Sequence, residues 1–119
     1  MRTLTLGLAV AFALVAGAAS AHPRLVSASP APGGQVAGSP RQIRIKFNEA
    51  VFPKFSGVTI KSQAGAAVKT GKAGVDPRDR TQLVVPVTTR LAPGRYRLIW
   101  RAVASDTHRV QGQYDFTVK

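Results

Sequence analysis

Residues 95–102 read Arg-Tyr-Arg-Leu-Ile-Trp-Arg-Ala, and this stretch decides the fold class. Apolar side chains recur at every second position, at Tyr96, Leu98, Trp100 and Ala102, and arginines fill most positions between them. Such alternation is typical of a β-strand with one face in the core and the other in solvent, because successive side chains of a strand point to opposite sides. The stretch therefore predicts a half-buried strand with arginines on its solvent face.

The same period of two recurs before and after this strand. In Gln42–Phe47 the side chains of Ile43, Ile45 and Phe47 share one side, and apolar residues alternate again over 114–118. Shorter strands are expected at 24–28, 57–62, 66–69 and 82–87, with turns or loops at 30–34, 38–40, 71–79 and 92–94. About seven short strands separated by Gly- and Pro-rich turns predict an all-β fold, an antiparallel Greek-key β-sandwich or barrel of the Ig-like kind.

The first 21 residues have the layout of a secretory signal peptide. Arg2 supplies the positive charge, residues 4–18 contain no charged side chain, and Ala19-Ser20-Ala21 fits the small-x-small cleavage pattern. This apolar run is shorter than the roughly 20 residues that a membrane-spanning helix needs. We therefore expect residues 1–21 to be removed before His22. Residues 22–119 would then be one soluble domain in the periplasm or outside the cell, with no stable membrane insertion after cleavage.

Composition excludes several function classes. The chain has no cysteine, so neither a disulfide nor a thiolate metal ligand is available. It carries 17 Lys and Arg against five Asp and Glu, a formal net charge of +12, which predicts attraction to anionic surfaces. These basic residues are spread along the chain and not clustered, as they are in arms that bind nucleic acid. We expect no nucleic-acid partner, and we interpret the outward arginines as the solvent face of a sheet.

Both histidines of the chain occur in contexts that could chelate a metal ion. Cleavage before His22 would give that residue a free α-amine beside its imidazole. Asp106 and His108 are two positions apart, so in an extended segment their side chains would project to the same side. Nitrogen and oxygen donors without sulfur favour Cu(II) on the Irving–Williams order, and Zn(II) is the alternative. The metal-free interpretation is that Asp106 and His108 are ordinary surface-loop residues.

With these motifs in view, the chain resembles the CopC family of periplasmic copper-binding proteins. The resemblance extends over most of the chain after residue 21, and its motifs lie in 22–33, 43–51, 91–100 and 105–112. It implies a cupredoxin-like or Ig-like β-sandwich with one Cu(II) ion per chain. The metal ligands of the family fall on His22, Asp106 and His108.

The resemblance also assigns Glu49 and marks three departures. The glutamate of the family falls on Glu49, where it would act in the outer shell of the metal, and the alternative is a loop carboxylate paired with a nearby base. Some members carry a methionine-rich Cu(I) site, but the only methionine here is Met1, so no such site is expected. Pro23 has no amide hydrogen, which excludes copper motifs built on successive deprotonated amides. Thr107 stands where glycine is frequent in the family.

The sequence therefore predicts a Cu(II)-binding protein, not an enzyme, that acts in copper sequestration, delivery or resistance. The resemblance implies a monomer whose partners are the copper ion and a membrane copper transporter or another copper protein. One alternative is a copper oxidase or oxygenase with an N-terminal histidine, which Asp106 argues against because a fourth ligand would leave less room for O₂. The aromatic residues, expected mostly in the core, also leave no platform for a sugar chain. The second alternative is a metal-free Ig-like interaction module.

Overall fold

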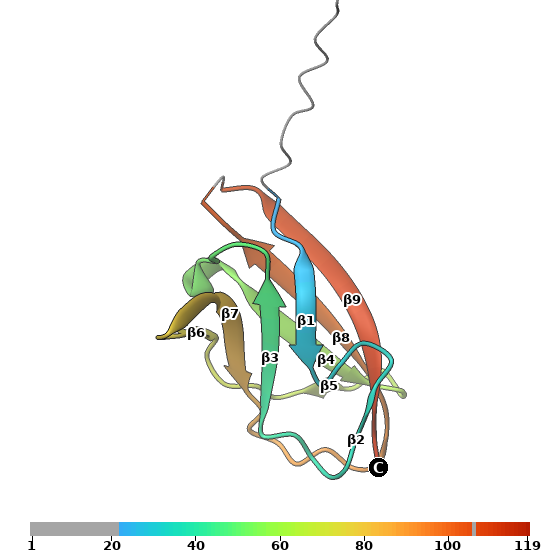
Figure 1. Cartoon of the computed structure of the whole chain (residues 1–119). Coiled ribbons are helices and arrows are strands. Elements are labelled where there is room, and N and C mark those ends of the chain that lie inside the picture. Colours follow the sequence, from blue (N-terminus) through green and yellow to red (C-terminus); the bar gives the residue numbers. More distant parts are fainter. Residues whose placement is uncertain (1–21, 106) are drawn as a thin grey trace, which may run out of the picture.

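Two β-sheets face each other in the computed structural model (Figure 1), which describes residues 22–105 and 107–119. One sheet has four strands in the order β1-β3-β7-β6, and the other has five strands in the order β2-β9-β8-β4-β5. The predicted β-sandwich is thereby confirmed. The predicted signal peptide at 1–21 and the predicted ligand Asp106 lie outside the described residues.

The strands are short, and every named pair except β2–β9 is antiparallel. The four-stranded sheet consists of β1 (Leu25–Ser29), β3 (Gln42–Phe47), β7 (Asp79–Pro86) and β6 (Gly74–Asp76). The five-stranded sheet consists of β2 (Gln35–Val36), β9 (Arg109–Val118), β8 (Gly94–Val103), β4 (Gly57–Ser62) and β5 (Ala67–Val68). A single 3₁₀ turn, η1 (Pro53–Phe55), precedes β4.

Two strands were not expected from the sequence. Residues 71–79, predicted as a loop, contain β6 and the first residue of β7, which pair across a turn stabilised by Asp76, whose Oδ1 accepts a hydrogen bond from Arg78 N at 2.9 Å. The three residues of β6 are all half-buried, so they show no alternation that a pattern could detect. β2 has two residues and exists through its pairing with the end of β9. Both strands depend on tertiary contacts and not on local sequence pattern.

The core lies between the sheets and follows the predicted alternation. Ile43, Ile45 and Phe47 of β3 are fully buried, and the alternate residues Tyr96–Ala102 of β8 face them from the other sheet. The ring of Trp100 meets Phe47 edge-on at 5.3 Å between centroids. Gly112, its cross-strand partner on β9, has no room for a side chain because the indole of Trp100 covers it. Aromatic packing thus fixes both the sheet spacing and the β8–β9 register.

Three segments converge at one end of the sandwich: the chain before β1, the loop after β3, and the β8–β9 connection (Figure 1). They contain His22, Glu49 and His108 respectively, so the fold brings together residues from distant parts of the chain. We call this end the metal end, because it contains the predicted ligands His22 and His108 and the predicted outer-shell residue Glu49. In the part of the chain that the structure describes, no helix is long and apolar enough to cross a membrane.

Candidate metal centre

The N-terminal segment is fixed against the loop after β3. Arg24 N donates a hydrogen bond to Asn48 Oδ1 at 2.6 Å, and Asn48 N donates one to Arg24 O at 3.0 Å. Pro23, between His22 and Arg24, is fully buried. This reciprocal pair of bonds extends the β1–β3 pairing by one step beyond Leu25, which pairs with Phe47. His22 is therefore held at the surface of the metal end and does not trail away from it.

The β8–β9 connection presents His108 from the opposite side of the metal end. Thr107 N donates a hydrogen bond to Ala104 O at 2.9 Å, which closes a tight turn before β9. Thr107 has φ 64°, a left-handed backbone conformation that is rare for a β-branched residue because its side chain crowds the backbone. The turn thus holds one strained residue directly before His108. Glycine would adopt this backbone conformation without that crowding.

The two histidines meet across the metal end. The ring centroids of His22 and His108 lie 5.4 Å apart, and the ring planes are tilted by 34°. A metal ion typically bonds an imidazole nitrogen at about 2.0–2.1 Å, so one ion could reach a nitrogen of each ring at this separation. Both side chains are exposed, which leaves the pair accessible to an incoming ion. The contact joins the two residues that the sequence analysis identified as nitrogen ligands.

Glu49 lies in the loop after β3, and this loop contacts both of the segments that carry the histidines. On one side of this loop Asn48 bonds Arg24, and on the other side Val51 forms a β-bridge with Ala104. The Oε1 atom of Glu49 is buried and has no hydrogen-bond partner among the described residues. No lysine or arginine of residues 22–105 and 107–119 forms an ion pair with it. A buried carboxylate oxygen without a partner is energetically costly, and a nearby cation would compensate it.

The described donors do not make a complete metal site by themselves. Among residues 22–105 and 107–119, no three His, Asp or Glu side chains are grouped closely enough to hold an ion. Asp106, the predicted carboxylate ligand, is next to Thr107 in the chain but lies outside the described residues. The histidine pair and the unpartnered oxygen of Glu49 nevertheless fit the donor chemistry of a divalent ion, because nitrogen and oxygen are present and sulfur is absent.

A pair of exposed aromatic residues beside the metal end was not expected. Phe52 is 42% exposed and Phe55 is 53% exposed, whereas the aromatic residues were predicted to lie mostly in the core. Both belong to the η1 region, which has no alternation, so the strand pattern could not assign them. Together with Val103, Thr107 and Arg109 they line a shallow hollow of about 400 Å³. The exposed pair therefore adjoins the turn that carries His108.

Comparisons with known proteins agree with this architecture. The family model described as the CopC domain matches residues 25–119. Protein YobA of Escherichia coli K12 is 36% identical over 119 residues, which cover 99% of this chain and 96% of that protein. Copper resistance protein C of Pseudomonas syringae pv. tomato is 38% identical over 126 residues, which cover 99% of this chain and 97% of that protein.

A solved structure matches the described sandwich. The crystal structure of CopC from Methylosinus trichosporium OB3b superposes with a TM-score of 0.76 at 34% sequence identity. The match covers 82% of this chain and 94% of that one. The family match over residues 25–119 includes all the strands of both sheets.

Proposed function

The chain belongs to the CopC family, whose members are copper-binding resistance proteins and not enzymes, and from that premise we propose that it binds one Cu(II) ion per molecule at the metal end. The observation that carries the proposal is the contact between His22 and His108, whose ring centroids lie 5.4 Å apart. Neither imidazole belongs to the buried core, so this contact joins two exposed side chains from distant segments of the chain.

The proposed ligands are His22, Asp106 and His108. After cleavage before His22, its α-amine and imidazole would supply two nitrogens, His108 a third, and Asp106 one carboxylate oxygen. Four such donors suit the tetragonal geometry of Cu(II), the divalent ion that nitrogen and oxygen sites hold most strongly. Copper here is cargo, and the side chains serve to bind and orient it.

Glu49 is proposed to act from the outer shell. Its unpartnered Oε1 could accept a hydrogen bond from a ligand, such as an imidazole N–H or the α-amine of His22. Such a bond would fix the orientation of that ligand and raise its basicity. The negative charge of Glu49 would also offset part of the charge of the bound ion.

The setting of this site follows from the signal-peptide pattern. We propose that residues 1–21 are removed on export and that the protein works as a monomer in the periplasm. There it would sequester copper or deliver it to a membrane copper transporter. The chain has no cysteine, so the donors available to the ion are nitrogen and oxygen, which suit Cu(II).

The α-amine ligand can be tested by changing only the position of the N-terminus. The exported protein is compared with a variant that retains one additional alanine before His22, with both N-termini verified by mass spectrometry. Copper affinity is measured by competition with a chelator of known affinity. The extension keeps both imidazoles but displaces the amine, so we expect a loss greater than the about 10- to 100-fold that outer-shell changes cause. Unchanged affinity would contradict an amine ligand.

A further inference from the structure

The outer face of the five-stranded sheet carries an excess of positive charge. Residues 95, 97 and 101 alternate with the buried side chains of β8, so they lie on the solvent face. We call this surface the cationic face and define it by Lys61, Arg95, Arg97, Arg101 and Arg109. Asp115 of β9 is the acidic residue that accompanies them on these three strands.

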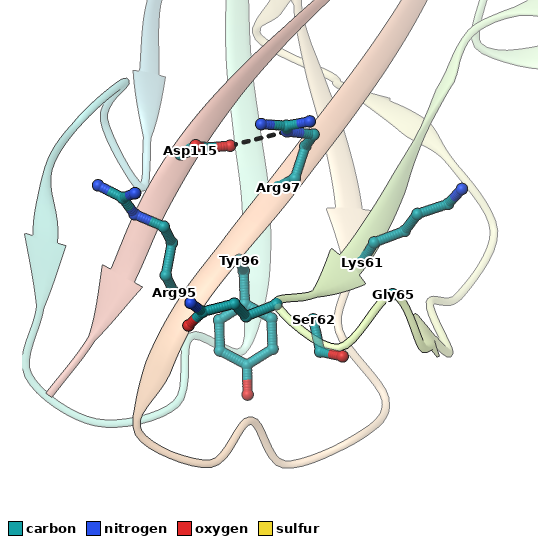
Figure 2. A pocket seen from close by; sticks show the side chains of 8 residues that line it. Lys61, Ser62, Gly65, Arg95, Tyr96, Arg97 and Asp115 are labelled. Atoms are coloured by element: carbon teal, nitrogen blue, oxygen red, sulfur yellow. Dashed lines mark hydrogen bonds and ion pairs between the residues drawn. The ribbon is translucent and has the colours of Figure 1, made fainter.

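The basic residues of the cationic face are mostly unpaired with acids. Lys61 and Arg97 are direct cross-strand partners, an arrangement that costs stability because like charges repel. Arg97 Nε forms an ion pair with Asp115 Oδ1 at 3.1 Å. Figure 2 shows this pair beside Lys61 and Arg95. These residues line a hollow of about 340 Å³. Within the described residues no carboxylate lies at ion-pair distance from Lys61, Arg95 or Arg101.

On the opposite sheet, two basic residues form ion pairs with carboxylates. On the four-stranded sheet, Arg44 Nη1 lies 3.0 Å from Asp76 Oδ2, and Lys46 Nζ lies 3.7 Å from Asp79 Oδ2. Its central strand therefore pairs basic residues with carboxylates of β6 and β7. The two basic residues of β3 are thus paired with carboxylates, whereas Lys61, Arg95 and Arg101 of the five-stranded sheet have no such partner among the described residues.

The exposed phenylalanines lie at one end of the cationic face. Val103 is the cross-strand partner of Arg109 and shares its outer side, and it is only 7% exposed although it is not part of the main core cluster. Phe52 N bonds Val103 O at 2.8 Å, and Phe52 and Phe55 line a hollow with Val103 and Arg109. Phe52, Phe55 and Arg109 therefore line one hollow at this end of the cationic face.

We propose that the cationic face is a peripheral binding surface for an anionic lipid bilayer. Its basic residues are spread over three strands, and Arg95 and Arg101 alone are separated by roughly 20 Å of extended chain. A plane of phosphate headgroups can meet all of them at once, whereas a short acidic peptide could meet only a few. Phe52 and Phe55 would enter the headgroup region, as aromatic rings of peripheral proteins do.

This orientation has a consequence for the metal end. Arg109 directly follows His108, so the histidine pair lies at the rim of the cationic face. A molecule lying on a bilayer through this face would carry its metal end beside the membrane surface. The bilayer inference does not depend on copper binding, and a copper-free protein is expected to bind lipid equally well.

The test uses the exported protein and vesicles of two compositions, phosphatidylcholine alone and phosphatidylcholine with about one third phosphatidylglycerol. Binding is measured by co-sedimentation at low salt and at roughly 0.15 M salt, where the Debye length is about 8 Å. The face variant replaces Lys61, Arg95 and Arg97 by Gln. The matched control replaces Arg41, Arg78 and Arg80 by Gln, which removes the same charge from exposed positions of the four-stranded sheet and its adjoining turns.

We expect binding to the anionic vesicles only. Each basic residue near such a surface contributes about fivefold, so the face variant should bind roughly 100-fold more weakly and the control should change little. Phe55→Ser should weaken the binding that remains at the higher salt, and His22→Ala should leave it unchanged. Equal losses in the face variant and the control would overturn the assignment to this face. No binding of the unchanged protein to anionic vesicles at either salt concentration would overturn the proposal and favour an acidic protein partner.

Discussion

The strands of the sandwich and its metal end follow opposite rules. In β3 and β8 each apolar side chain faces the core and each charged one faces solvent, so local pattern, burial and packing agree. At the metal end, Thr107 has a strained backbone, Glu49 has a buried oxygen without a partner, and two imidazoles meet at the surface. The packed strands stabilise the fold, whereas the strained and unpartnered groups of the metal end lower its stability, as is common at functional sites. Changes in the two regions should therefore affect different properties.

Gly112→Val should have the largest effect and should act on stability alone. The indole of Trp100 occupies the space that a side chain at residue 112 needs, and Trp100 cannot retreat because it packs against Phe47. We expect a loss of about 3 kcal/mol or more in the free energy of unfolding, measured by chemical denaturation. Gln113→Val, at the neighbouring exposed position, is the control and should be tolerated. Equal stability of the two variants would mean that the core is not as tightly packed as described.

His108→Ala should have the second largest effect and should act on copper alone. Its ring is exposed, so its removal should leave the melting temperature of the copper-free protein nearly unchanged. Copper affinity should fall by more than about 100-fold, beyond the range of outer-shell substitutions. Glu49→Gln is the comparison and should lose about 10- to 100-fold. If Glu49→Gln weakened copper binding more than His108→Ala, the assignment of ligand and outer-shell group would be wrong.

Thr107→Gly should have the third largest effect and should stabilise the folded protein by relieving strain at the metal end. Glycine adopts the left-handed conformation without the crowding that a β-branched side chain meets there, although it costs more entropy on folding. We expect the free energy of unfolding to rise by up to about 1 kcal/mol, measured by thermal or chemical denaturation. Thr107→Ala keeps a Cβ atom and should give less than half of this gain. A destabilising effect of glycine would show that no strain is stored in this turn.

Asp76→Asn should have the smallest effect. The hydrogen bond from Arg78 N and the guanidinium of Arg44 lower the pKa of Asp76 below its ordinary value of 3.8. A carboxylate with a lowered pKa stabilises the folded state above its ordinary pKa, and this contribution disappears as the pH falls through the folded value. The variant should thus be slightly less stable near neutral pH and should match the unchanged protein in strong acid. Denaturation curves at several pH values should show a difference that shrinks as the pH falls, and a difference that grows in acid would contradict this explanation.

The sequence predicted the strands better than the connections between them. The bounds of β3 and β4 agree with the expected 42–47 and 57–62, because their alternation is set by the core that they face. β2 and β6 could not be predicted, since each exists only through pairing with a longer strand. The same holds for the exposed Phe52 and Phe55, which lie in a segment without any period.

The sequence could predict which residues belong to the candidate site, but not that they lie close together in space. His22 and His108 could be identified from their neighbours in the chain, Asp106-x-His108 and the predicted cleavage point. Their proximity depends on Asn48 bonding Arg24 and on Val51 bridging Ala104, which no local pattern encodes. The buried oxygen of Glu49 likewise became visible only when the loop after β3 was seen between the two segments.

The most direct test of the central claim is a Cu(II) titration of the exported protein, with its N-terminus verified and with electron paramagnetic resonance spectra recorded at each step. We predict that one equivalent binds tightly, with an axial spectrum and hyperfine splitting from several nitrogens, as expected for an amine and two imidazoles in a tetragonal site. The signal should disappear in acid, where protons compete for the nitrogens. Weak binding without defined stoichiometry, or a spectrum without nitrogen coupling, would contradict the account.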